Sequence, residues 1–131
     1  MEAKFFKCRI SEQVALRLIE KPIPLMCCGE WMIEPENNDP RFDAKKHLPV
    51  VTRLDDCRLR IEVGEAPHPM LPEHHIDFIY VATEHGGRFV YLTDKPSTEI
   101  CCGDDRPIAV YAYCNLHGMW KTDLQTPPVL A

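Results

Sequence analysis

The sequence lacks long apolar runs, an excess of basic charge and an even set of cysteines. Its apolar runs, such as residues 23–28, which contain a proline, are far shorter than the roughly 18 residues of a membrane-spanning helix, so we expect no membrane segment. The first residues lack the apolar core of a secretory signal, which predicts a reducing cytoplasm where cysteines stay thiols or bind metals. With 15 Lys and Arg against 20 Asp and Glu and no basic stripe, nucleic acid is not an expected partner. The 7 cysteines, an odd number, argue against a disulfide framework.

Helix-favouring stretches are also scarce, and 12 prolines stand against 6 glycines. Short β-branched and aromatic runs predict strands instead. In residues 57–63, apolar residues from Cys57 onward alternate with charged ones, which predicts a half-buried strand with Cys57 packed on its core face. Further strands are expected at residues 50–54, 76–82, 88–92 and 108–114, with residues 93–107 as a connection. The pattern predicts an all-β protein in which residues 37–131 form an immunoglobulin-like antiparallel β-sandwich.

Residues 1–36 have a different character and predict a small β-hairpin module. Two short apolar runs, residues 5–10 and 14–19, precede the pair Cys27 and Cys28, and the polar residues 34–40 form a linker. A piece of this size cannot bury a sizeable core. We therefore expect a metal, a partner chain or the larger domain to stabilise it.

Seven cysteines and six histidines are many metal-binding side chains for 131 residues. Cys114 continues the inward face of its strand, and the turn that follows can bring His117 alongside it, so one metal could contact both. Prolines on both sides of His68 hold it on a rigid loop. Taken one at a time, each of these residues could equally be a packing residue, a surface residue or a zinc ligand.

Three segments taken together resemble the desulfoferrodoxin and neelaredoxin family of superoxide reductases. They are Lys-His-Leu-Pro-Val at 46–50, His-Pro-Met at 68–70 with a histidine six positions after the first, and Tyr-Cys-Asn-Leu-His-Gly-Met-Trp-Lys at 113–121. The resemblance implies a mononuclear non-haem iron with four equatorial imidazoles and one axial thiolate, supplied by His47, His68, His74, His117 and Cys114.

The same resemblance implies the activity and its partners. The iron would reduce superoxide by one electron to hydrogen peroxide without dismutation, with electrons from a small donor such as rubredoxin. Lys46 matches the family's lysine beside the iron, and its charge is expected to attract superoxide. We expect a homodimer.

Two positions depart from the family pattern. Lys45 stands where the family usually has a glutamate that caps the ferric iron, so we expect no carboxylate cap unless Asp43 substitutes. In the N-terminal module, which resembles desulforedoxin, Cys8, Cys27 and Cys28 match a rubredoxin-type site, but Ser11 takes the fourth position, so iron, zinc and no metal all stay open; Cys101 or Cys102 could supply the missing sulfur.

Two alternative functions remain open on this reasoning. One is a zinc-stabilised β-domain that binds without turnover, and the other is a rubredoxin-type electron carrier that uses the N-terminal cysteines. Five ligands exceed the four of a structural zinc site, which favours iron. Around the site, Trp120 is expected at the edge of the sandwich, His75 as a supporting or surface group, and Glu73 or Asp77 as the acceptor for a ring N–H of a metal-bound histidine.

Overall fold

The structure is a computed structural model that describes residues 4–124. It divides into two compact units, Met1–Glu36 and Asn37–Ala131. The predicted modules 1–36 and 37–131 therefore include short ends, residues 1–3 and 125–131, that lie outside the described residues.

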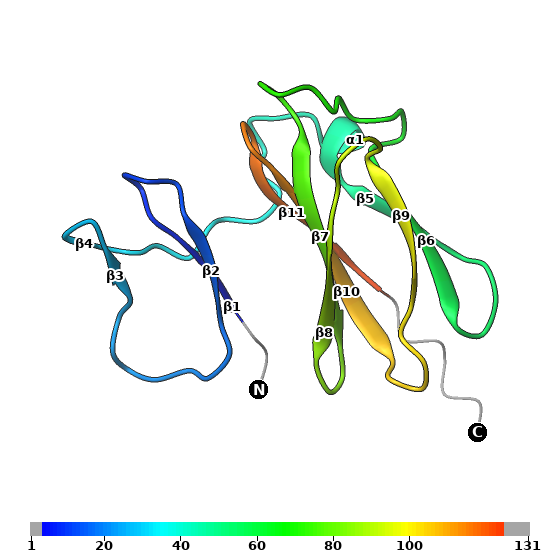
Figure 1. The fold of residues 1–131 in the computed structure, drawn as a ribbon, viewed down its shortest axis with the longest axis horizontal. Helices are drawn as coiled ribbons and strands as arrows, with labels where there is room; N and C mark the ends of the chain where they lie inside the picture. The colour runs from blue at the N-terminus through cyan, green and yellow to red at the C-terminus, as the bar shows by residue number, and fades with distance from the viewer. Residues whose placement is uncertain (1–3, 125–131) are drawn as a thin grey trace. The chain divides into compact units, whose positions relative to one another are not determined.

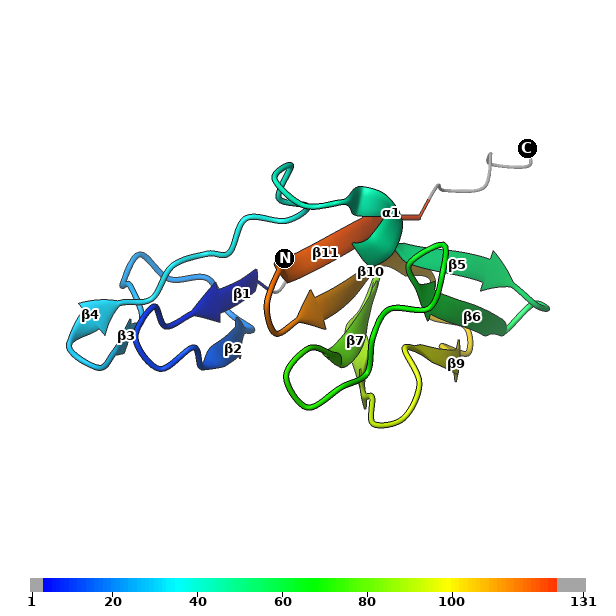
Figure 2. The ribbon, with the colours of Figure 1, turned by 90° about the horizontal axis from the view of Figure 1, so that it is seen from above.

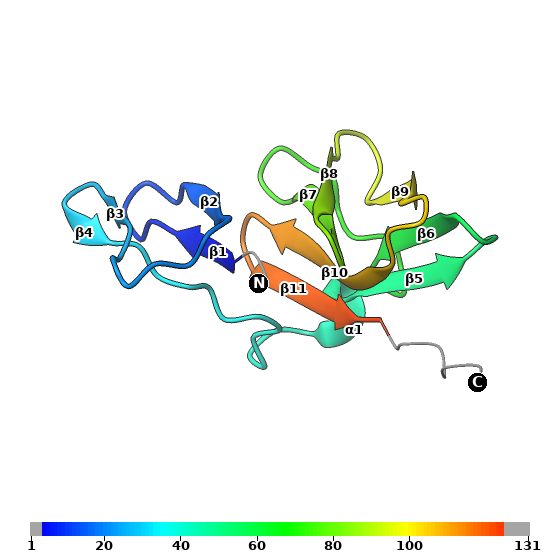
Figure 3. The same cartoon turned by 90° about the horizontal axis from the view of Figure 1, so that it is seen from below.

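The first unit consists of two hairpins. Strands β1 (Lys4–Lys7) and β2 (Val14–Arg17) pair antiparallel, as do the two-residue strands β3 (Met26–Cys27) and β4 (Glu30–Trp31), and Figure 3 shows both pairs. Cys28 and Gly29 both have positive φ, which is the geometry that a two-residue hairpin turn requires. Two backbone hydrogen bonds between Lys7 and Ile33 then tie the hairpins together.

The second unit contains two antiparallel sheets, which Figures 1 and 2 show from two sides. One has the strand order β11-β10-β7-β8 and the other the order β5-β6-β9. Their strands are β5 (Pro49–Arg53), β6 (Arg58–Val63), β7 (Ile76–Thr83), β8 (Gly87–Tyr91), β9 (Ser97–Cys101), β10 (Pro107–Cys114) and β11 (Gly118–Asp123). The antiparallel all-β architecture is confirmed.

The core lies between these sheets. In β6, Leu59, Ile61 and Val63 are buried while the residues between them are exposed, as the alternation predicts. They pack against residues such as Ile79 and Val110 from β7 and β10. Because successive side chains of a strand point to opposite faces, this period of two fixes which face of β6 joins the core.

Two elements differ from the sequence-based expectation. Strand β9 lies inside residues 93–107, which we expected to be a connection. It has one fully buried apolar residue, Ile100, and its backbone pairing with β6 defines it instead. The four-residue helix α1 (Ala44–His47) is too short for a periodic signal, and the Asp43 side chain caps it by accepting from the Lys45 N–H at 2.9 Å. No helix among residues 4–124 is long and apolar enough to cross a bilayer.

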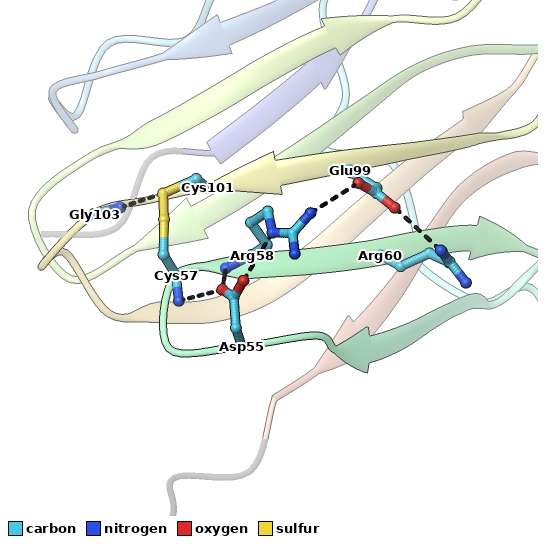
Figure 4. Close-up of polar contacts among 7 residues, drawn as sticks. All are labelled: Asp55, Cys57, Arg58, Arg60, Glu99, Cys101 and Gly103. Carbon is cyan, nitrogen blue, oxygen red and sulfur yellow. Dashed lines mark hydrogen bonds and ion pairs between the residues drawn. A yellow bond between two sulfur atoms is a disulfide. The ribbon is translucent and has the colours of Figure 1, made fainter.

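The expectation for Cys57 and Cys101 is wrong. Cys57 was expected in the core and Cys101 as a spare thiol, but the two form a disulfide with a Cα–Cα distance of 5.0 Å (Figure 4). Arg58 pairs with Cys101 in the β6–β9 register, which brings the neighbouring Cys57 within disulfide reach. Cys101 therefore offers no thiol to a metal, and the remaining five cysteines are free.

Candidate metal centre

The five predicted ligands come from three segments that meet at one end of the sandwich. In Figure 1, helix α1, the loop from β6 to β7 and the turn from β10 to β11 all lie at the upper end of this unit. They carry, in order, His47, then His68 and His74, then Cys114 and His117.

His47 is the last residue of α1 and is buried. The helix ends there because Leu48 turns to extended backbone and leads into β5. The ring Nδ1 of His47 lies 2.8 Å from the Asp43 carbonyl, to which it donates. This bond fixes the tautomer, so the Nε2 atom presents a lone pair to the interior.

His68 and His74 present buried nitrogen atoms that nothing in the described chain satisfies. The Nδ1 of His68 donates to the Pro69 carbonyl at 2.8 Å, while its Nε2 and the Nε2 of His74 have no hydrogen-bond partner among residues 4–124. Leaving a buried polar atom unsatisfied costs on the order of 1–3 kcal/mol. Two such acceptors side by side are the arrangement that a bound cation would satisfy.

The donor atoms converge on one point. One nitrogen of each of His47, His68 and His74 and the Cys114 sulfur all lie within 4.8 Å of one another. Donors bonded to one transition-metal ion at about 2.1–2.3 Å lie at most about 4.5 Å apart, so small shifts would place all four on one ion. This group could hold a metal ion, and its donor set fits a mononuclear iron.

His117 lies against this group and turns its Nδ1 toward it. That atom is 2.9 Å from the Nε2 of His47 and 3.7 Å from the Cys114 sulfur. The structure therefore brings together all five residues predicted from the sequence, four in a tight group and His117 beside it.

The protonation states suit a cation. Burial lowers the pKa of His68 to about 4 and also lowers the pKa of His117, which favours the neutral imidazoles that bind a metal ion. Burial raises the pKa of the Cys114 thiol. The backbone N–H groups of Leu116 and His117 have the opposite, smaller effect on this pKa, because they stabilise the thiolate. A metal ion at this point would supply the positive charge that deprotonates the thiol.

Trp120 supports two of the histidines. Its ring stacks on His47 with a centroid distance of 4.6 Å and an interplanar angle of 16°. Its Nε1 donates to the His117 carbonyl at 3.2 Å, and the residue is fully buried. The structure thus places Trp120 at the site, in contact with ligand-bearing segments.

Asn115 links the two loops, a role that sequence reasoning missed. Its Oδ1 accepts from the His75 N–H at 2.8 Å and its Nδ2 donates to the Glu73 carbonyl at 3.1 Å. Its own N–H donates to the His75 carbonyl at 3.1 Å. The three bonds hold the segment around His74 against the residue that follows Cys114. The only signal in the sequence was its place beside the thiol.

Asp77 contacts His75 and not one of the candidate metal ligands, for which either Glu73 or Asp77 was the expected acceptor. Its Oδ1 lies 2.8 Å from the Nε2 of His75, whose Nδ1 faces the Leu71 carbonyl at 2.8 Å. The Leu71 carbonyl and then Asp77 raise the pKa of His75, because both ring nitrogens face oxygen acceptors. His75 is therefore a supporting group, and Glu73 contributes through its backbone carbonyl.

The first unit contains a second sulfur cluster. The Sγ atoms of Cys8, Cys27 and Cys28 lie within 4.8 Å of one another and could hold a second metal ion. Ser11 stands at the fourth side: its N–H donates to the Cys8 sulfur at 3.3 Å, and its Oγ lies 3.6 Å from the Cys27 sulfur. Hydrogen bonds from the side chain and then the backbone of Ser11 to the Cys8 sulfur lower the pKa of Cys8 to about 6.

Fold and site together define a β-sandwich metalloprotein with mixed imidazole and thiolate ligands. The desulfoferrodoxin family model matches residues 40–123, and the chain belongs to this family. A desulfoferrodoxin homolog from Archaeoglobus fulgidus is 33% identical over 100 residues, which cover 75% of this chain and 78% of that protein. A superoxide reductase from Pyrococcus abyssi is 34% identical over 110 residues, 64% of this chain and 90% of that protein. The crystal structure of the superoxide reductase from Treponema pallidum superposes with a TM-score of 0.75 at 27% identity, covering 93% of this chain and 98% of that one.

Proposed function

We propose that the protein is a non-haem iron superoxide reductase. Its ligands would be the imidazoles of His47, His68, His74 and His117 and the sulfur of Cys114. The bound iron would supply the one-electron chemistry, in which superoxide, one electron and two protons give hydrogen peroxide. The observation that carries the proposal is the convergence of these donors around the unpartnered Nε2 atoms of His68 and His74, in a chain of this family.

The number and type of donors favour iron over zinc. A structural zinc site is closed by four ligands, whereas five donors surround this point. A carboxylate-free set of imidazoles and one thiolate also suits a redox metal, because the thiolate donates electron density through the metal. Either alternative, the zinc-stabilised domain or the electron carrier, leaves the fifth donor unexplained.

Lys46 is proposed to attract the anionic substrate. Superoxide approaches a chain with a net charge of −5, so a local positive charge is needed. Lys46 is exposed on α1 directly before His47. Two opposite unit charges about 4 Å apart attract by about 4 kcal/mol at an effective dielectric of about 20, while charges beyond roughly 8 Å are screened. Local charge therefore outweighs the average field.

The helix also bears on the oxidised iron. Lys45, in the place of the family glutamate, is exposed on α1, and an Oδ1 of Asp43 is already engaged as the helix cap. We therefore propose a ferric site without a carboxylate cap. A ferric crystal structure with a protein carboxylate on the iron would contradict this.

The electron donor is proposed to be a small one-electron carrier such as rubredoxin, and the assembly a homodimer. The first unit exposes several large apolar side chains, each more than half accessible, which favours burial against a second copy: Ile10, Leu18, Ile19, Ile23, Met26 and Trp31. We propose a reducing compartment such as the cytoplasm, because five of the seven cysteines are free thiols; the Cys57–Cys101 disulfide is the exception.

Metal content and colour test the main proposal. The oxidised iron–thiolate protein should be blue and should contain one iron in the unit Asn37–Ala131 of each chain. A colourless zinc protein would refute the proposal. His68→Ala should abolish the colour, whereas His85→Ala, which changes an exposed histidine bonded to Asp105, should keep it. Cys27→Ala tests the N-terminal cluster, because unchanged metal content would mean that no metal depends on it.

Reaction with superoxide tests the lysine. Lys46→Ala should lower the second-order rate constant by about tenfold or more and weaken its dependence on salt. Lys45→Ala is the matched control, since it removes the same charge one residue further from His47. Equal effects of the two variants would show that only net charge matters.

A further inference from the structure

The Cys57–Cys101 disulfide lies at the opposite end of β6 from the candidate metal centre. Cys57 precedes Arg58, the first residue of β6, whereas the chain reaches His68 after Val63, its last residue. A six-residue strand is about 20 Å long. We propose that this disulfide is a reversible redox site, oxidised by hydrogen peroxide and reduced by a dithiol. The inference does not depend on the proposed superoxide reaction.

Small molecules can reach the pair from the side of Cys101. Cys57 and Cys101 are both half-buried. Cys101 lines an open cavity of about 240 Å³ together with Cys102, Arg88 and Asp105. A water molecule occupies roughly 30 Å³ in the liquid, so peroxide and the thiol end of a reductant both fit.

The surroundings favour a thiolate on Cys101. The Gly103 N–H donates to the Cys101 sulfur at 3.4 Å, and the exposed Arg88 donates to the Cys101 carbonyl at 3.1 Å. Arg58, beside Cys57, is already paired with Asp55 at 2.8 Å and lies 3.8 Å from Glu99, so its charge is largely compensated (Figure 4). Cys101 is therefore the better leaving sulfur on reduction and the better nucleophile on oxidation.

The backbone keeps the two sulfurs close when the bond is broken. Asp55 Oδ1 accepts from the backbone N–H groups of Cys57 and Arg58 at 2.9 and 2.8 Å, which fixes the turn before β6. The pairing of Arg58 with Cys101 fixes the other side. None of these bonds involves the disulfide itself, so the reduced pair remains positioned for reoxidation.

The atoms and electrons balance in both the oxidation and the reduction of the pair. On oxidation, the Cys101 thiolate attacks the peroxide O–O bond and forms a sulfenic acid with release of hydroxide, and the Cys57 thiol then displaces water to form the disulfide. Two thiols and one hydrogen peroxide thus give one disulfide and two waters. On reduction, a dithiol attacks Cys57, expels the Cys101 thiolate, and its second thiol resolves the mixed disulfide.

Reduction of the disulfide should affect strand β9. This strand lies at the edge of its sheet, and the disulfide ties its last residue to the start of β6. Its other end is held by a backbone bond from Val63 to Pro96. Without the covalent link, the Cys101 end should open more often, because an edge strand has one neighbour only.

Differential alkylation of the full-length protein tests the proposal. We expect dithiothreitol to convert Cys57 and Cys101 to thiols while the circular dichroism spectrum stays native, and added hydrogen peroxide to restore the bond in peptide maps. Amide exchange at Ile100 and Cys101 should be at least about tenfold faster in the reduced protein. Cys102→Ser is the matched control, because it removes the neighbouring thiol in the same cavity and should cycle normally.

Two results would overturn the inference. In the first, the pair resists dithiothreitol until the protein unfolds, which would make the bond a permanent structural link. In the second, peroxide oxidises other cysteines and leaves Cys57 and Cys101 as thiols. Because peroxide is added directly, either outcome is independent of whether the same sample reduces superoxide.

Discussion

Gly64 offers a sharp test of how the ligand segments are held together. It has a φ of +84°, and a Cβ at this position would lie 2.6 Å from the Ala66 carbonyl oxygen and 2.8 Å from that of Lys46. The Gly64 N–H also donates to the Leu48 carbonyl at 3.1 Å. Gly64 thus lies between the segment that carries His47 and the segment that leads to His68.

The cost of Gly64→Ala follows from these contacts. The left-handed backbone conformation costs about 1–2 kcal/mol for a residue with a Cβ. Relieving contacts that are too close costs a further 1–3 kcal/mol, roughly, because backbone atoms must move. We expect a loss of about 2–5 kcal/mol in the free energy of unfolding. The displaced carbonyls belong to Lys46 and Ala66, so iron affinity should also fall, by about tenfold for each 1.4 kcal/mol that reaches the site.

Gly103→Ala is the matched control. Gly103 also has a positive φ, +60°, but a Cβ added there would meet no heavy atom of the described chain within 4 Å. This variant should lose only the conformational part, about 1–2 kcal/mol, and keep its iron. Urea unfolding of the metal-free proteins and competition with an iron chelator measure the two effects. If the two variants behave alike in both assays, the close approach at Gly64 does not position the ligands.

Other contacts in the second unit lead to three more predictions. Burial holds the pKa of His68 at about 4, below the 6.5 of an exposed histidine, so the unfolded chain binds the proton first; stability of the metal-free protein is full above pH 6.5 and falls by up to about 3 kcal/mol toward pH 4. Urea midpoints that stay constant over this range would contradict it. Cys57→Ser opens a loop with a sequence separation of 44 and should lower the unfolding free energy by about 4 kcal/mol. Dithiothreitol-treated wild type should match that variant, and a difference would point to another cause. Asn115→Ala removes two side-chain hydrogen bonds and should cost about 2 kcal/mol and speed iron release, measured by unfolding and chelator kinetics; unchanged release would show that the two loops hold without it.

The local sequence pattern was sufficient to predict most strands of the β-sandwich. The strand at β6 follows from alternation alone, because side-chain direction along a strand depends only on backbone geometry. Strand β9 escaped this reasoning, since one buried residue, Ile100, gives no periodicity and the strand depends on its hydrogen bonds to β6. Helix α1 is likewise one turn long and rests on the Asp43 cap.

The site shows the same division. Sequence alone named His47, His68, His74, His117 and Cys114, through a resemblance carried by residues at 46–50, 68–74 and 113–121. It assigned no role to Asn115 and left open whether Glu73 or Asp77 orients a metal-bound histidine, whereas Asp77 contacts His75, because hydrogen-bond partners depend on which loops come face to face.

The sequence alone therefore determined the all-β class, the family and the set of candidate metal ligands. Each of these depends on local pattern or on short motifs. Tertiary structure decided which of these residues meet. His47 and His117 are 70 positions apart yet have nitrogens 2.9 Å from each other, and Cys57 joins Cys101 across a separation of 44. Such pairings depend on strand register and loop packing, which are set by the whole folded chain and not by any single stretch of it.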